Sequence, residues 1–218
     1  MSTFSLQKRQ DLFPTPLFYF KVENFKELNE QLVRDSLALK ASAKGIKRSN
    51  QHGWHSGTTL FELKEESFQS LCKIIVQSAA MATKQIAPKF ESAKFLTKCS
   101  GWININSKGA YNVPHEHPGY CWSGSYYVKV PESKTERGGF IEFLDFKPVI
   151  PSIEMIGSPL LGDKYRIKPE EGLLLLFPSH LKHWVYPNEG EQERISIAFN
   201  IRYESKLVKA VSLTKKIV

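Results

Sequence analysis

The chain has 218 residues and a formal net charge of +8, with 41% hydrophobic and 12% aromatic residues. This length and composition exclude an intrinsically disordered chain and two large domains, so we expect a single folded domain over residues 1–218. Half of the positive excess comes from lysines of the C-terminal tail, and no Lys- or Arg-rich run is interleaved with aromatic residues, so the charge does not favour a nucleic-acid partner.

The N-terminal region predicts a strand followed by two helices. Residues 15–22 are aromatic and β-branched, as in a strand, and Asn24 is placed to cap a helix that extends to about residue 44. Residues 45–59 are rich in Gly, Ser and Asn and lack periodicity, which predicts a long loop of the kind that often has a function. Apolar residues at helical spacing over 68–86 predict a second helix.

From about residue 95 the sequence changes to short runs of alternating apolar and polar residues, separated by Gly, Pro and Asn, which is typical of strands. The predicted strands are 95–106, 122–130, 139–145, 164–168, 172–177 and 194–203, with shorter ones near 113–117 and 182–186. About eight strands at this spacing favour a mainly β fold, a barrel or sandwich, with the two helices flanking one sheet. We therefore divide the domain into 1–94, which packs on the barrel, a β core over 95–203 and a basic tail over 204–218.

The strongest local signal for chemistry is His115-Glu116-His117. On a strand, residues two apart project to the same face, so both imidazoles could meet one metal ion while Glu116 points away. A pair of packed or surface histidines is the alternative, and the motif alone does not exclude it. The apolar run over 172–177 leads into a turn that holds His180 and, at the start of the next extended run, His183. We favour His183 as the third ligand and keep His180 as the alternative.

Three imidazoles suit iron, zinc, copper or nickel, so the ligand type alone does not select the metal. A second signal follows on the next predicted strand, where Arg194 and Ser196 share a face. A buried Arg needs an anionic partner, and its planar guanidinium matches a carboxylate, to which a hydroxyl can add a further hydrogen bond. The sequence therefore predicts that Arg194 and Ser196 bind a carboxylate, with an ordinary surface arginine as the alternative.

A family resemblance rests on the order Tyr111, His115-x-His117, Ser123-Gly124-x-Tyr126-Tyr127, Phe177-Pro178-x-x-Leu181-x-His183-x-Val185 and Arg194-x-Ser196. This order resembles the 2-oxoglutarate/Fe(II) oxygenases of the prolyl-hydroxylase type, and more narrowly a group of such oxygenases from bacteria and phages. The resemblance covers about residues 99–203, and a weaker match begins at Ser49-Asn50. It implies a double-stranded β-helix, a jelly-roll or cupin-like barrel, which agrees with the strand count.

The resemblance also implies an activity and a set of site residues. The activity is that of a dioxygenase, a hydroxylase, which uses Fe(II), 2-oxoglutarate and O2 to oxidise a small molecule or a peptide. His115 and His183 match the first and last iron ligands, and Arg194 with Ser196 matches the clamp on the distal carboxylate of 2-oxoglutarate. Tyr127 matches a position that often hydrogen-bonds the same carboxylate, and Asn104 is a candidate for the C1 side or the metal-bound end of 2-oxoglutarate.

One position departs from the family pattern, because His117 stands where the family has an Asp or Glu. A neutral third ligand leaves the site one unit more positive and is expected to weaken metal retention unless the surroundings compensate. A cupin of another chemistry is one rival, since Gly109 and the two histidines fit half of its motif, but its glutamate is missing and Arg194 would have no role. A binding or phage structural module without enzymatic activity is a further rival.

The substrate site and the setting of the protein are the remaining expectations. Trp54 and His55 in the predicted loop could line the rim of the site and contact a substrate by stacking and hydrogen bonding. Three cysteines at unrelated spacings and an N-terminus without an apolar segment predict a cytoplasmic protein without disulfides. We expect no membrane partner, because no apolar run approaches the roughly 20 residues that span a bilayer. A homodimer is included among the expected states.

Overall fold

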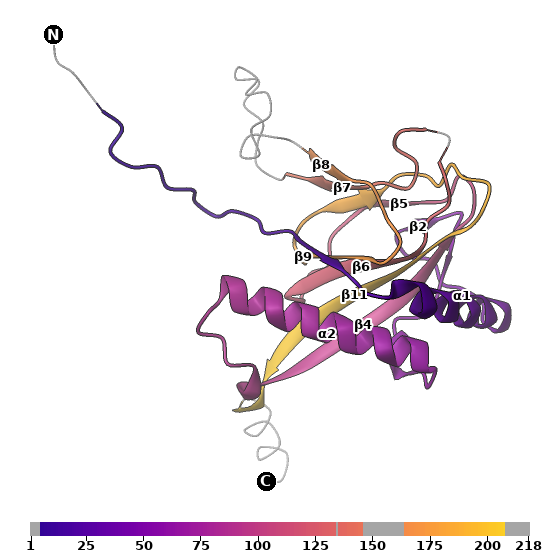
Figure 1. Ribbon diagram of the computed structural model, residues 1–218, viewed down its shortest axis with the longest axis horizontal. Helices are drawn as coiled ribbons and strands as arrows, with labels where there is room; N and C mark the ends of the chain where they lie inside the picture. Colours follow the sequence, from indigo (N-terminus) through magenta and orange to yellow (C-terminus); the bar gives the residue numbers. More distant parts are fainter. Residues whose placement is uncertain (1–4, 134, 146–163, 208–218) are drawn as a thin grey trace.

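Two antiparallel sheets and two helices make up the computed structural model, which describes residues 5–133, 135–145 and 164–207 (Figure 1). The N-terminal elements are β1 (Phe18–Lys21), α1 (Phe25–Ser42), β2 (Asn50–Gln51), β3 (Trp54–His55), the 3-10 turn η1 (Leu60–Glu62), α2 (Glu66–Ile86) and the 3-10 turn η2 (Ser92–Lys94). The β core follows with β4 (Phe95–Asn106), β5 (Tyr111–His115), β6 (Trp122–Lys129), β7 (Ile141–Leu144), β8 (Lys164–Ile167), β9 (Leu173–Pro178), β10 (His183–Val185) and β11 (Arg194–Ser205).

The strands form two sheets that face one another. The major sheet has the order β1-β9-β6-β11-β4-β3, and the minor sheet has the order β2-β5-β10-β7-β8. The predicted mainly β fold with flanking helices is confirmed, but among the described residues the two sheets are not joined into a closed barrel. The reason lies in the edge strands, which are only two to four residues long and so offer few backbone groups for pairing across the gap.

Period-2 alternation on the major sheet separates two cores. One face carries apolar side chains such as Ile103, Ile197 and Phe199, which pack against Leu71 and Ile75 of α2. Figure 1 shows both helices on this side of the sheet. A second, smaller core lies between the two sheets and contains Tyr127, Leu175 and Phe177 of the major sheet with Ile141, Phe143 and Ile167 of the minor sheet. The inward face of the major sheet therefore combines apolar residues with the polar positions of β4, β6 and β11.

Three local expectations need correction. Asn24 does not cap α1 with its side chain; it adopts a left-handed conformation with φ of 51°, which a short polar residue tolerates. The predicted loop over 45–59 contains β2 and β3, which form because the edges of β5 and β4 supply their hydrogen bonds. The last strand continues to Ser205, two residues into the predicted tail, and residues 208–218 of that tail lie outside the described residues. Within the described ranges, neither α1 nor α2 is long and apolar enough to cross a bilayer.

Candidate metal centre and carboxylate site

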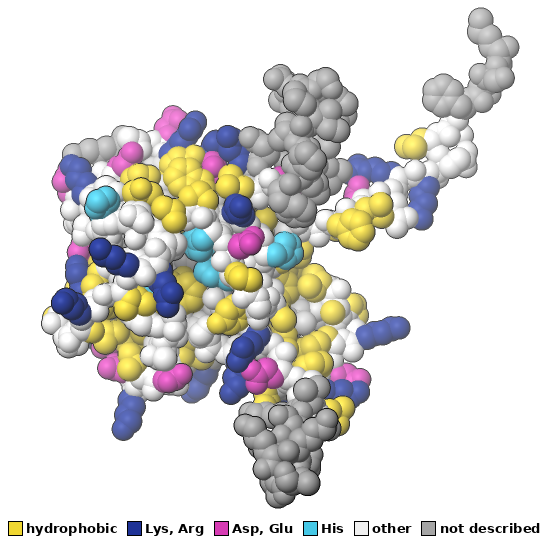
Figure 2. Space-filling model, turned by 180° about the vertical axis from the view of Figure 1, so that it is seen from behind, with side chains coloured by type: hydrophobic (Ala, Val, Ile, Leu, Met, Phe, Trp, Pro, Cys, Tyr) yellow, Lys and Arg dark blue, Asp and Glu magenta, His cyan; other side chains and the backbone are white. Residues whose placement is uncertain are grey.

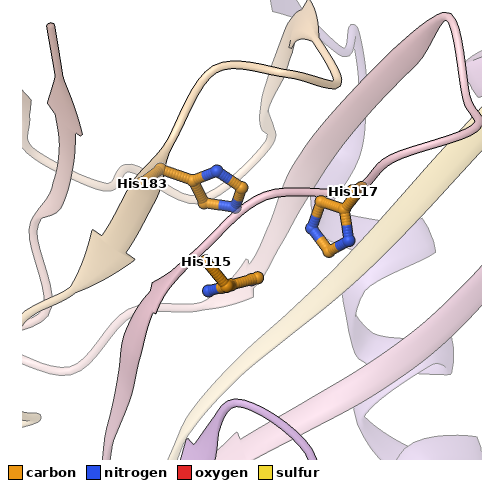
Figure 3. Close-up of side chains that lie close together, drawn as sticks. All are labelled: His115, His117 and His183. Atoms are coloured by element: carbon orange, nitrogen blue, oxygen red, sulfur yellow. The ribbon is translucent and has the colours of Figure 1, made fainter. Parts of the chain in front are cut away.

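Two neighbouring strands of the minor sheet position the histidine cluster. His115 ends β5 and His183 begins β10, and these two residues are directly paired in the antiparallel register. His117 lies beyond the end of β5, where its backbone N–H donates to the carbonyl of Ser179 at 2.9 Å. The three side chains point toward one another (Figure 3). A turn held by this hydrogen bond, rather than the alternation of a strand over 113–117, thus brings His117 into the cluster.

The spacing of the three histidines fits a single metal ion. One donor nitrogen from each lies within 4.8 Å of the others. Three nitrogens that bind one ion at about 2.1 Å with roughly tetrahedral angles lie about 3.4 Å apart, so small side-chain movements within this limit would bring all three around one ion. The ring centres are 4.4 Å apart for His115 and His183, 4.9 Å for His115 and His117, and 5.3 Å for His117 and His183.

Hydrogen bonds orient two of the three rings. Nδ1–H of His115 donates to the carbonyl of Val113 at 2.7 Å, and Nδ1–H of His183 donates to the carbonyl of Leu181 at 2.9 Å. Each bond leaves the lone pair of Nε2 free for a metal. Histidines that bind metals commonly donate their other ring N–H to a carbonyl in this way. The ring of His117 has no such bond in the described structure and packs near the indole of Trp102, with 5.6 Å between ring centres.

Burial keeps the cluster in the form that binds metals. It lowers the pKa of His183 to about 3 and the pKa of His117 to about 4, and it also lowers the pKa of His115. Because a ligating imidazole must be neutral, these shifts leave the site ready for a metal at neutral pH.

The facing wall of the cavity is a row of side chains on the major sheet. Ser196 on β11 pairs with Asn104 on β4 and with Tyr127 on β6, so these three residues are cross-strand neighbours on one face. Arg194 lies two residues earlier on the same face, with its guanidinium carbon 5.3 Å from the centre of the Tyr127 ring. All four residues are buried. The structure therefore brings together the residues that the sequence suggested for 2-oxoglutarate.

Several polar atoms in this row lack a partner within the described ranges. Nε of Arg194, the hydroxyl of Tyr127 and Oδ1 of Asn104 are buried without a hydrogen bond. Burial lowers the pKa of Arg194 and raises the pKa of Tyr127, so a cation and a neutral phenol stand side by side with no Asp or Glu among the described residues that line the cavity. A carboxylate would accept hydrogen bonds from both and would compensate the buried charge. The wall thus fits an anionic ligand with a carboxylate group.

A cavity of about 40 Å³ separates the histidines from this wall and is lined by residues of both. His183 is buried, whereas His115 and His117 are half-buried. Figure 2 shows histidine side chains on the surface of the face that it draws, and the partial exposure of His115 and His117 means that the cluster can be reached from solvent. The metal ligands and the carboxylate site therefore share one accessible cavity.

The other predicted site residues lie elsewhere. The indole N–H of Trp54 donates to the carbonyl of Ala43 at 3.2 Å, and the ring packs on the core beside the helices, away from the cavity. His55 is buried behind the cavity wall and stacks on Trp102, with 5.7 Å between ring centres and 10° between ring planes. His180 is exposed in the turn after β9 and is not part of the histidine cluster.

Sequence reasoning missed several residues that line the cavity. Trp102 precedes Asn104 by two on β4, and Ser125 precedes Tyr127 by two on β6, so strand alternation was the signal that could have found them. Asn112 also lines the cavity, and it accepts a 3.4 Å hydrogen bond from Nδ2 of Asn106.

Residues 100–200 match the model of the family described as "Putative 2OG-Fe(II) oxygenase". No curated protein matches this sequence. Among solved structures, the chain is similar to a prolyl-4-hydroxylase from Pseudomonas putida, with a TM-score of 0.58, 15% identity, and coverage of 84% of this chain and 91% of that one. A prolyl hydroxylase from Trichoplax adhaerens, in complex with a peptide fragment of hypoxia inducible factor, has a TM-score of 0.58, 14% identity, and coverage of 89% and 86%.

A third similar structure is that of the epimerase SnoN in complex with Fe3+, alpha ketoglutarate and nogalamycin RO, with a TM-score of 0.60, 10% identity, and coverage of 85% of this chain and 78% of that one. At these identities the likeness establishes the fold, and the expected jelly-roll architecture is confirmed. The family match covers the segment that holds the histidine cluster and the carboxylate wall. Residues 100–200 are therefore similar to the family of 2OG-Fe(II) oxygenases, and the fold of the chain is the one these solved structures share.

Proposed function

We propose that this chain is a 2-oxoglutarate-dependent dioxygenase that holds Fe(II) with His115, His117 and His183, and that Arg194 binds the distal carboxylate of 2-oxoglutarate. Arg194 carries the proposal, because it is a buried cation whose Nε has no partner in the described structure and which lies across a shared cavity from a metal-binding cluster. A metal site alone would leave this charge unexplained, whereas a carboxylate co-substrate compensates it.

The residues around Arg194 have complementary roles in this proposal. Ser196 and Tyr127 offer hydroxyl groups to the same carboxylate, and the pKa of Tyr127, raised by burial, keeps its hydroxyl proton available for donation. Asn104, on the neighbouring strand, is suited to the end of 2-oxoglutarate nearer the metal. Its unpartnered Oδ1 can accept a hydrogen bond there, and the amide can present its N–H groups instead if the side chain is turned over.

When bound together, Fe(II) and 2-oxoglutarate supply the activation of O2, coupled to oxidative decarboxylation of 2-oxoglutarate. The protein contributes orientation and exclusion of water. The wall residues are buried, so their hydrogen bonds to a carboxylate face little competition from solvent, while the half-buried His115 and His117 leave one side of the cluster open. We propose that the substrate, a small molecule or a peptide, approaches from that side and is hydroxylated.

The test is calorimetric titration of 2-oxoglutarate into anaerobic, Mn(II)-loaded protein, with metal content measured on the same samples. We expect one 2-oxoglutarate per metal and no heat of binding in the metal-free protein at the same concentrations. A protein that holds zinc and shows no binding of 2-oxoglutarate would instead support the cupin-like alternative. Release of succinate from 2-oxoglutarate by the Fe(II)-loaded protein in air then reports the oxygenase chemistry itself.

A further inference from the structure

The connection between β10 and β11, residues 186–193, joins the two halves of the proposed site. β10 begins with the metal ligand His183, and β11 begins with Arg194. The connection therefore determines where β11 enters the major sheet and where the side chain of Arg194 starts. One of its residues, Asn188, is only 4% exposed and yet belongs neither to the histidine cluster nor to the cavity lining.

The side chain of Asn188 forms hydrogen bonds with both its nitrogen and its oxygen. Nδ2 donates to the carbonyl of Asn106 at 2.9 Å and to the carbonyl of Gln192 at 2.8 Å. Oδ1 accepts a hydrogen bond from the backbone N–H of Gly190 at 3.2 Å. Two backbone hydrogen bonds, of 2.7 and 2.9 Å, also link Asn188 to the turn that follows β4. Every polar group of this buried residue is thus used to hold the connection.

The two partners of Nδ2 flank Arg194. Asn106 is the residue of β4 that pairs directly with Arg194 in the antiparallel register, and Gln192 precedes Arg194 by two residues. Asn188 therefore bridges the strand that receives Arg194 and the segment that leads into it. Because these hydrogen bonds are buried, water competes little with them, and they fix the backbone from which the arginine side chain extends.

The stem of the Arg194 side chain is confined by the same connection. A Cβ atom placed on Gly139 would lie 3.3 Å from Cδ and 3.5 Å from Nε of Arg194, so the backbone of Gly139 lies close beside the stem. The backbone N–H of Gly139 in turn donates to the carbonyl of Pro187 at 2.9 Å. A charged group whose backbone and stem are both held is presented at one depth in the cavity, which is how supporting residues preorganise a binding site.

We propose that Asn188 is a positioning residue for Arg194 and that, through it, the connection 186–193 determines the length of the 2-oxo diacid that the cavity accepts. The inference rests on the proposed function, because this length runs from the metal held by the histidines to the guanidinium of Arg194. A diacid that is one methylene group longer than 2-oxoglutarate misplaces its distal carboxylate. It then loses at least one charge-assisted hydrogen bond, which weakens binding by about tenfold or more.

The experiment compares three 2-oxo acids in anaerobic, Co(II)-loaded protein. The visible absorption of Co(II) changes when a 2-oxo acid joins the metal, so the dissociation constants are measured without turnover. The probes are 2-oxoglutarate, 2-oxoadipate, which is one methylene group longer, and 2-oxovalerate, which has five carbons but no distal carboxylate. We expect the wild-type protein to bind 2-oxoglutarate at least about tenfold more tightly than either of the other two.

Two variants of Asn188 test the positioning role. Asn188→Ala removes the whole hydrogen-bonding group, and Asn188→Asp keeps Oδ1 for Gly190 but removes both donations from Nδ2. Both variants should weaken 2-oxoglutarate by about tenfold and reduce its advantage over 2-oxoadipate to within about threefold. The affinity for 2-oxovalerate should stay within about threefold of the wild type, because this ligand does not reach Arg194.

Two control variants separate positioning from a general loss of stability. Lys108→Ala removes an exposed ion pair of 2.7 Å with Glu191 of the same connection and should leave all three affinities unchanged. Leu71→Ala removes a buried side chain of α2 and should lower stability without changing the preference among the three ligands. If neither Asn188 variant folds, Gly139→Ala takes their place, because its methyl group would press on the stem of Arg194 and should likewise reduce the preference for 2-oxoglutarate over 2-oxoadipate.

The outcomes distinguish this inference from the proposed function. A wild-type protein that binds 2-oxovalerate as tightly as 2-oxoglutarate makes no use of the distal carboxylate, which contradicts the proposed function and the inference with it. A wild-type preference that persists unchanged in the Asn188 variants contradicts only the inference. Equal weakening of 2-oxoglutarate and 2-oxovalerate in these variants would also overturn it, because Asn188 would then support the fold as a whole and not the position of Arg194.

Discussion

Arg194→Met should remove 2-oxoglutarate binding while leaving the metal site intact. The methionine keeps much of the length and apolar character of the stem but removes a cation that is only 3% exposed and whose Nε has no partner among the described residues. Loss of one member of a buried charge pair costs about 3–5 kcal/mol, so the dissociation constant of 2-oxoglutarate should rise by roughly two to three orders of magnitude. Calorimetric titration of the Mn(II)-loaded variant measures this change, and metal analysis should show unchanged Mn(II) content.

The same strand provides a matched control. Arg202 on β11 is half-exposed and forms an ion pair with Glu204 at 2.7 Å, so Arg202→Met should leave the affinity for 2-oxoglutarate unchanged. Arg194→Lys should bind 2-oxoglutarate more tightly than Arg194→Met and less tightly than the wild type, because a lysine cannot reproduce the two-point contact. An unchanged dissociation constant in Arg194→Met would refute the role of this residue.

Arg194→Met also has a stability signature that a merely structural arginine would not give. In the absence of ligand the guanidinium of Arg194 is buried, and burial lowers its pKa. The buried charge therefore lowers the free energy of unfolding of the wild-type protein. The variant without metal and 2-oxoglutarate should therefore unfold with a free energy no lower than the wild type, and higher by on the order of 1 kcal/mol. Urea unfolding measures this difference, and a clear loss of stability would mean that Arg194 has a structural partner instead.

Three further predictions concern the ligands, the pH dependence and the packing. His115→Ala or His183→Ala should lower metal affinity by at least about 100-fold, measured by competition with a chromophoric chelator, because each removes one of three ligands; stoichiometric metal in either variant would contradict the assignment. Burial holds the pKa of His117 at about 4 and that of His183 at about 3, so below the ordinary histidine pKa of about 6.5 the unfolded chain binds more protons than the folded one. The free energy of unfolding of the metal-free protein should therefore be highest above about pH 6.5 and should fall as the pH is lowered toward 4. Urea unfolding at several pH values measures this change. Gly124→Ala should cost about 1–3 kcal/mol of stability, because the added methyl group would come within 2.3 Å of a core phenyl ring and a backbone carbonyl, whereas Gly57→Ala, with open space around it, should cost much less in the same assay.

The sequence predicted the strands well where burial on one face imposes alternation. The strand over 95–106 begins and ends as predicted, because both of its faces are buried along its second half: Ile103 and Ile105 pack in the larger core, and Trp102 and Asn104 line the cavity. The sequence could not predict β2 and β3, since two-residue strands have no period of their own and depend on the edges of β5 and β4. Closure of a barrel was likewise unpredictable, because it depends on pairing between edge strands far apart in the sequence.

The candidate site was predictable in its residues and less so in its geometry. Arg194 and Ser196 were found because their spacing on a strand places them on one face, and the pairing of Ser196 with Tyr127 follows from the register of the sheet. The position of His117 came from a hydrogen bond to Ser179, a contact that no local pattern reveals. Trp54 was misplaced because an aromatic residue in a glycine-rich loop can pack inward as readily as it can line a rim.

The arrangement of the site on two sheets has a physical consequence for how its halves cooperate. The histidines belong to the minor sheet and its turn, whereas Arg194, Ser196, Tyr127 and Asn104 belong to the major sheet, so no single element fixes the distance between metal and carboxylate site. That distance is set by the small core between the sheets, where the ring of Phe177 lies 4.8 Å from the ring of His183 and from that of Phe143. Interiors are close-packed, so a change of side-chain volume in this core shifts one sheet against the other. We therefore expect metal affinity and 2-oxoglutarate affinity to be coupled through packing as well as through charge, most directly at Tyr127, which belongs both to this core and to the carboxylate wall.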